Sequence, residues 1–168
     1  MSAKIRLLPT REETIAFAVR LARAGASCVT IHLRFPSQRE HEAAHWDELI
    51  PIVEALRPLG VPVLANGDMY RWSDAAALRV STGCAGVMLA RPALFNLSLF
   101  RNNTHFGNNL STINDQTGDS NPSSASVALL PIELIIRRYL EECIRWDPVY
   151  QNAKYTVMEM LNNRRHPK

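Results

Sequence analysis

The sequence predicts an α/β fold: the last four β/α units of a (β/α)8 TIM barrel, followed by a small C-terminal helical domain. Four short apolar segments (residues 4–8, 28–33, 61–65 and 86–90) alternate with amphipathic helical segments. Because these segments are apolar on both faces, they are typical of a parallel sheet covered by helices. With 168 residues, the chain is too short for a complete barrel of ~250 residues.

The helical segments between these strands carry recognisable end signals. Thr10 and Glu13 have the spacing of a capping box, and Gly25 supplies a stop for the helix that they open. Further helices are expected over residues 46–59, 73–81 and 93–100. A doubly wound sheet has units of the same size, but no Gly-x-Gly-x-x-Gly follows any of the strands. The barrel is therefore favoured.

The composition changes sharply after residue 101. Residues 102–126 hold six Asn and five Ser without Lys or Arg, which predicts a flexible insertion. A helix is expected over residues 131–146, and Asp147 and Pro148 predict the cap and first position of another. The predicted domains are residues 1–101 (the barrel half), 102–126 (the insertion) and 127–168 (a helical domain).

Composition and charge exclude several functions. With 46% hydrophobic and 21% charged residues, the chain resembles an ordinary globular protein, and its formal charge of +3 alone does not indicate nucleic-acid binding. Cys28, Cys84 and Cys143 have no metal-ligand spacing, so we expect buried reduced thiols and no metal. Neither a Ser-His-Asp arrangement nor a Walker loop is present. Without an apolar span or secretory signal, we expect no membrane contact and a cytoplasmic protein, with nucleus and mitochondrion as alternatives.

Polar residues stand at the ends of all four predicted strands, where a β/α barrel carries its function. In chain order they are Lys4 and Arg6, His32 and Arg34, Asn66-Gly67-Asp68, and Ala90-Arg91.

Each of these residues has a functional and a structural interpretation. Lys4 would suit an electron-rich ring or an anion if buried, but solvation beside the chain start is as good an explanation. His32 fits a ligand contact or a satisfied, half-buried histidine equally. The turn at residues 66–68 and Arg91 together favour an anion site such as a phosphate pocket, although each alone is only a turn or a surface charge. The three tryptophans, Trp46, Trp72 and Trp146, favour packing over base stacking.

In order and spacing, these strand ends resemble the second half of the barrel in the tRNA-dihydrouridine synthase family. The motifs that carry the resemblance are Lys4-Ile5-Arg6, Ile31-His32-Leu33-Arg34, Asn66-Gly67-Asp68 and Val87-Met88-Leu89-Ala90-Arg91. The tail, with Tyr150-x-Asn152-x-Lys154-Tyr155, is similar to the eukaryotic branch that modifies position 20 of tRNA.

The resemblance implies a flavoprotein that reduces uridine to 5,6-dihydrouridine in the D-loop of tRNA, with FMN as cofactor and NADPH as reductant. It implies substrate contacts for Arg34 and Lys154 and a tRNA-binding role for the helical domain. The residues that would contact FMN are Lys4, His32, Asn66, Gly67, Asp68, Ala90 and Arg91.

The sequence departs from the family pattern in ways that bear on activity. The family's catalytic cysteine lies ahead of the Lys-Ile-Arg strand, so we expect it and the first four units to be missing, and the fragment alone to be inactive. Leu33 replaces a glycine beside His32, and the insertion separates the barrel from the helices. The alternatives are a catalytically dead remnant that binds tRNA or a partner, self-association through exposed sheet edges, and a flavin barrel for a small molecule.

Overall fold

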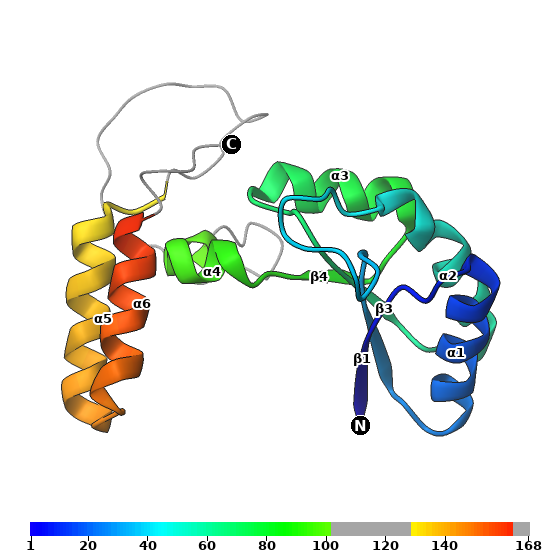
Figure 1. Ribbon diagram of the computed structural model, residues 1–168, viewed down its shortest axis with the longest axis horizontal. Coiled ribbons are helices and arrows are strands. Elements are labelled where there is room, and N and C mark those ends of the chain that lie inside the picture. The colour runs from blue at the N-terminus through cyan, green and yellow to red at the C-terminus, as the bar shows by residue number, and fades with distance from the viewer. Residues whose placement is uncertain (102–128, 163–168) are drawn as a thin grey trace, which may run out of the picture. The chain divides into compact units, whose positions relative to one another are not determined.

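The computed structural model describes residues 1–101 and 129–162 (Figure 1). The chain divides into two compact units, Met1–Ala90 and Arg91–Lys168. The predicted insertion lies outside the described residues. None of the described helices is long and apolar enough to cross a membrane.

The first unit is built on a four-stranded parallel sheet with strand order β1-β2-β3-β4. Its strands are β1 (Ser2–Arg6), β2 (Cys28–His32), β3 (Val63–Asn66) and β4 (Gly86–Met88). The helices between them are α1 (Arg11–Arg23), α2 (Leu49–Leu56) and α3 (Trp72–Thr82). One 3-10 turn, Trp46–Glu48, precedes α2, and another, Arg57–Leu59, follows it.

The order of the strands decides between the two β/α architectures. A doubly wound sheet reverses its strand order and places helices on both faces. Here the order is sequential, and α1, α2 and α3 lie on the same side of the sheet (Figure 1). The structure confirms an α/β fold that forms part of a β/α barrel.

The core of this unit lies between the sheet and its helices. Alternate strand residues, Val29 and Ile31 in β2 and Val63 and Ala65 in β3, are buried against the helices. Leu49, Ile52, Val53 and Leu56 supply the buried stripe of α2. The intervening strand residues consequently point to the opposite face.

Helix α1 begins as the sequence predicts. The Thr10 hydroxyl accepts a hydrogen bond from the Glu13 amide, and the Glu13 carboxylate accepts one from the Thr10 amide, both at 3.2 Å. The helix ends at Arg23, with Gly25 at φ +98° just beyond it. The capping box is confirmed.

The second unit consists of helices among its described residues. It holds α4 (Arg91–Phe95), the 3-10 helix Leu97–Arg101, α5 (Ile132–Trp146) and α6 (Tyr150–Asn162). Both α4 and α5 contact α6, and the Asn96 amide donates to the Leu130 carbonyl at 3.0 Å. The contacts therefore group residues 91–101 with the C-terminal helices, whereas the sequence analysis assigned them to the barrel half.

The predicted cap at Asp147 is wrong. Asp147 ends α5 in a left-handed conformation (φ +45°), donating its amide to the Cys143 carbonyl, and α6 begins only at Tyr150. The chain must reverse between two packed helices, and a left-handed residue at a helix end provides that reversal. Aspartate tolerates this conformation better than most residues.

Candidate functional site

The strand register brings the predicted site residues of the first three strands onto one face of the sheet. Arg6 is paired with His32, His32 with Asn66, and Asn66 with Met88, which makes one row across the carboxyl ends of the strands. One layer deeper, Lys4 is paired with Thr30. All these residues alternate with the helix-facing core, so they share the inner face of the barrel segment.

His32 lies in a positively charged, partly buried environment. Burial, followed by the charges of Arg6, Lys4 and Arg34, lowers its pKa from 6.5 to about 4, against an opposing effect of Asp68. Nη1 of Arg34 lies 3.4 Å from Nε2 of His32. Because a guanidinium can only donate, Nε2 must accept and the ring proton resides on Nδ1. His32 is thus a neutral hydrogen-bond donor at its other nitrogen.

A titration can check this protonation state. We expect the His32 ring to stay neutral, with its proton on Nδ1, until the pH approaches about 4. The folded chain binds this proton less readily than the unfolded chain. The neutral ring therefore makes its full contribution to the free energy of unfolding above pH 6.5. This contribution is lost as the pH falls toward 4. Histidine ¹⁵N chemical shifts measure both properties; a ring protonated on Nε2, or titrating near 6.5, would contradict the assignment.

Arg34 is held by internal partners. Its side chain is only 3% exposed, and Nη2 donates to both carboxylate oxygens of Asp68 at 2.6 Å. Nε donates to the Glu42 carbonyl at 2.7 Å and Nη2 to the Glu40 carbonyl at 3.3 Å. Asp68 also accepts from the Ala44 amide at 2.8 Å. This pair fixes the loop between β2 and α2; the substrate contact of Arg34 and the cofactor contact of Asp68 stay predictions.

Arg6 has a positioning role that the sequence analysis did not assign. Its Nη1 lies 3.2 to 3.4 Å from the carbonyl oxygens of Phe35, Pro36 and Gln38. The same loop is therefore held by Arg6 from β1 and by Arg34 from β2. The only sequence signal was an arginine inside an apolar strand, which costs free energy to bury unless acceptors surround it.

Asn66 and Gly67 form a turn with little room for other residues. The Asn66 side-chain amide donates to the Met88 carbonyl at 2.8 Å, which links β3 to β4. Gly67 has φ +131°, and a Cβ there would lie 3.0 Å from the Cβ of Ala44 and 3.5 Å from Cδ2 of His32. Its carbonyl accepts from the Trp46 indole at 3.0 Å. The glycine thus lets the turn approach His32 closely.

The other predicted site residues lie elsewhere. Ala90 is exposed two residues beyond β4 and is the last residue of the first unit. Arg91 is the first residue of α4, and Lys154 is exposed on α6, both in the second unit. Their predicted ligand contacts stay predictions.

The cysteines and tryptophans only partly follow expectation. All three cysteines are free, but only Cys84 is buried, while Cys28 and Cys143 are half-buried. Trp46 packs on the core as predicted. Trp146 is 76% exposed and its indole donates a hydrogen bond to Glu142, so the prediction that Trp146 packs in the core is wrong. No group of three or more potential metal-ligating side chains occurs among the described residues.

The first unit is a segment of a β/α barrel, and its cationic and hydrogen-bonding side chains gather at the carboxyl ends of the strands. Enzymes with this fold carry their active sites at that edge. A family model described as "Dihydrouridine synthase (Dus)" matches residues 1–134. The chain belongs to the dihydrouridine synthase family.

Individual relatives support the same family. The chain is 37% identical over 101 residues to the tRNA-dihydrouridine(20) synthase [NAD(P)+] of Schizosaccharomyces pombe, a match that covers 60% of this chain and 21% of the relative. It is 36% identical over 100 residues to the tRNA-dihydrouridine(20a/20b) synthase [NAD(P)+] of Saccharomyces cerevisiae, covering 60% and 27%. A probable tRNA-dihydrouridine synthase of Aquifex aeolicus is also 36% identical, over 101 residues, covering 60% and 31%.

The chain thus spans between about a fifth and a third of the length of these relatives. The bacterial and eukaryotic proteins are similarly close, so the comparisons establish the family without selecting a branch.

Proposed function

We propose that the chain supplies the C-terminal half of the barrel in a tRNA-dihydrouridine synthase, the enzyme that reduces uridine to 5,6-dihydrouridine in the D-loop of tRNA. The similarity of the tail to the eukaryotic branch favours position 20. The observation that carries the proposal is the row at the strand ends, where a neutral His32 lies among Lys4, Arg6 and Arg34. A cationic face of this kind suits an anionic, electron-rich cofactor.

The residues of this face fit FMN by their chemistry. Lys4 is exposed on the inner face and makes no ion pair within the described residues, so its ammonium is available to an anion or to an electron-rich ring. His32 offers a neutral N–H donor, and Gly67 lets the turn after β3 pass close to its ring. FMN, with NADPH as reductant, would supply the hydride chemistry, while these residues bind and orient the cofactor.

Arg34 and Asp68 would act indirectly in this arrangement. Their ion pair holds His32 in one tautomer and fixes the loop around the turn at Gly67. Ala90 and Arg91 would add contacts near the cofactor phosphate, and Lys154 would contact the tRNA backbone, as the family resemblance implies.

The absorbance spectrum of the purified chain tests the proposal. We expect flavin bands, or their appearance on titration with FMN. Replacing Lys4 by methionine should weaken FMN binding by about tenfold to a hundredfold, because a charge-assisted contact contributes about 1.5 to 3 kcal/mol. Arg79→Met, which removes an exposed cation from α3, is the matched control and should leave binding unchanged. Equal affinity of Lys4→Met and the unmodified chain would refute the assigned contact.

A second candidate is a non-catalytic module that binds tRNA or another polypeptide. It is favoured by the edges of the four-stranded sheet, which have no further strand partner among the described residues. Binding of tRNA without any uptake of FMN would support this alternative over the first.

A further inference from the structure

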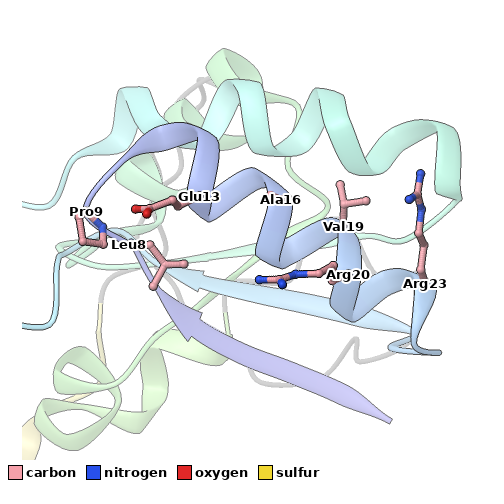
Figure 2. A pocket seen from close by; sticks show the side chains of 7 residues that line it. All are labelled: Leu8, Pro9, Glu13, Ala16, Val19, Arg20 and Arg23. Atoms are coloured by element: carbon pink, nitrogen blue, oxygen red, sulfur yellow. The ribbon is translucent and has the colours of Figure 1, made fainter.

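A groove of about 630 Å³ runs along α1 and carries both signs of charge. Figure 2 shows the Glu13 carboxylate near the end of the groove at Leu8 and Pro9, with Arg20 and Arg23 further along the helix. Acidic and basic side chains together select no ligand by charge. The contacts that shape the inner face of the sheet lie instead in the loop between β2 and α2.

The end of this loop, residues 44–46, holds the turn after β3 at two points. The Ala44 amide donates to Oδ2 of Asp68 at 2.8 Å, and the Trp46 indole donates to the Gly67 carbonyl at 3.0 Å. Ala44 and Trp46 also pack against the buried core, which limits their movement. Residues 44–46 are called the clamp below, because three consecutive residues fix two consecutive residues of another loop.

His45, the central residue of the clamp, ties it to the start of the same loop. Its amide donates to the Leu33 carbonyl at 2.7 Å, and its ring contacts the Phe35 ring at a centroid distance of 5.3 Å. Nε2 of His45 lies 3.0 Å from Nε2 of Gln38. Because Oε1 of Gln38 accepts from the Phe35 amide at 2.9 Å, its Nε2 must be the donor toward His45. The His45 ring therefore accepts at Nε2 and carries its proton on Nδ1.

The position of the turn matters because its backbone lies against the ring of His32. A Cβ built on Gly67 would be in van der Waals contact with Cδ2 of His32, at 3.5 Å. The Leu33 amide, which follows His32 in the chain, donates to the Asn66 carbonyl at 2.9 Å. A displacement of the turn consequently changes the surroundings of the His32 ring on the inner face.

We propose that His45 and Trp46 are positioning residues for the inner face of the barrel segment. The acceptor nitrogen of His45 keeps the clamp anchored to Gln38. The Trp46 indole holds the Gly67 carbonyl, so that the turn stays close to His32. Both residues act through the turn and not by touching a ligand. An effect on FMN binding rests on the proposed function, whereas the effect on His32 does not depend on it.

Trp46→Phe removes the indole N–H and keeps an aromatic ring against the core. We expect the ¹⁵N shifts of the His32 ring to move and FMN binding to weaken about three- to tenfold, as for the loss of one neutral hydrogen bond. Trp146→Phe is the matched control. The Trp146 indole also donates to an acceptor, Glu142 at 3.0 Å, but it is 76% exposed on α5, so this variant should change neither property.

Two replacements of His45 test the anchoring contact. His45→Phe keeps a ring beside Phe35 but removes the acceptor for Gln38, so it should also move the His32 shifts. His45→Gln offers an amide oxygen as acceptor and should restore the shifts of the unmodified chain. In the double variant His45→Phe/Trp46→Phe, the change should be smaller than the sum of the two single changes, since both act on one turn.

The His32 shifts are measured without cofactor, so a chain that takes up no FMN would count against the proposed function and leave this test intact. Circular dichroism reports whether each variant is folded; if Trp46→Phe does not fold, the two His45 variants decide. Unchanged His32 shifts in folded Trp46→Phe or His45→Phe, equal changes in Trp46→Phe and Trp146→Phe, or no restoration by His45→Gln would overturn the proposal.

Discussion

Replacing Arg34 by methionine is expected to destabilise the first unit by about 3 to 5 kcal/mol, the cost of leaving one partner of a buried ion pair alone. The guanidinium is 3% exposed and binds Asp68 together with two carbonyl groups of the β2–α2 loop. Methionine fills similar space but leaves the Asp68 carboxylate and both carbonyls without this donor. Urea unfolding followed by circular dichroism measures the change as a lower midpoint at an unchanged slope.

The matched control is Arg11→Met. Arg11 also donates twice to a carboxylate, that of Glu48, at 2.8 Å, but it lies on the surface, so its removal should change stability far less. In the double variant Arg34→Met/Asp68→Asn, the loss should be smaller than the sum of the two single losses, since no unpaired charge remains. Equal midpoints for Arg34→Met and Arg11→Met would show that the buried pair does not support the fold.

Internal hydrogen bonds explain how several positively charged side chains can lie together on the inner face in fixed positions. Arg6 and Arg34 both donate hydrogen bonds to carbonyl groups of one loop. These bonds fix the two side chains, and their positive charge still acts on the inner face of the sheet. Burial, together with the charges of Arg6, Lys4 and Arg34, lowers the pKa of His32 and keeps its ring neutral. Lys4 is then the cation on this face that a ligand can reach without first breaking internal contacts.

The fold was predictable because its signals are local. Alternation of apolar strands with amphipathic helices needs only a window of a few residues, and residues 28–33 were expected as a strand that the structure has as Cys28–His32. The capping box at Thr10 is equally local. The sequential strand order, which separates a barrel segment from a doubly wound sheet, depends on pairing between distant strands and required the structure.

For the candidate site, the sequence predicted which positions carry polar residues but not the contacts between them. Polar residues at strand ends identified Lys4, His32 and the turn at residues 66–68, but the sequence contains no sign that Arg34 pairs with Asp68, 34 residues away. The carbonyl contacts of Arg6 are hidden for the same reason, since they depend on the path of a loop. Asp147 was misassigned because aspartate serves both as a helix cap and as a left-handed residue.

Gly67→Ala is expected to destabilise the first unit by about 2 to 4 kcal/mol, because backbone strain and a steric clash coincide. At φ +131°, an alanine adopts a conformation that side chains rarely occupy, and its Cβ would lie 3.0 Å from the Cβ of Ala44. Ala44 cannot retreat freely, since its amide donates to Asp68. Relief must therefore move the loop or the turn, which disturbs both the Trp46 contact with the Gly67 carbonyl and the ring of His32.

Gly60→Ala separates the two contributions. Gly60 also has positive φ (+66°), but no atom lies within 4 Å of a Cβ built there, so this variant carries strain alone and should lose about 1 kcal/mol. Denaturant unfolding gives both stabilities, and the ¹⁵N shifts of His32 should move in Gly67→Ala only. If the two variants lose equal stability and leave His32 unchanged, then the turn has room for a side chain. The close approach of Gly67 to His32 would then have no role in shaping the inner face.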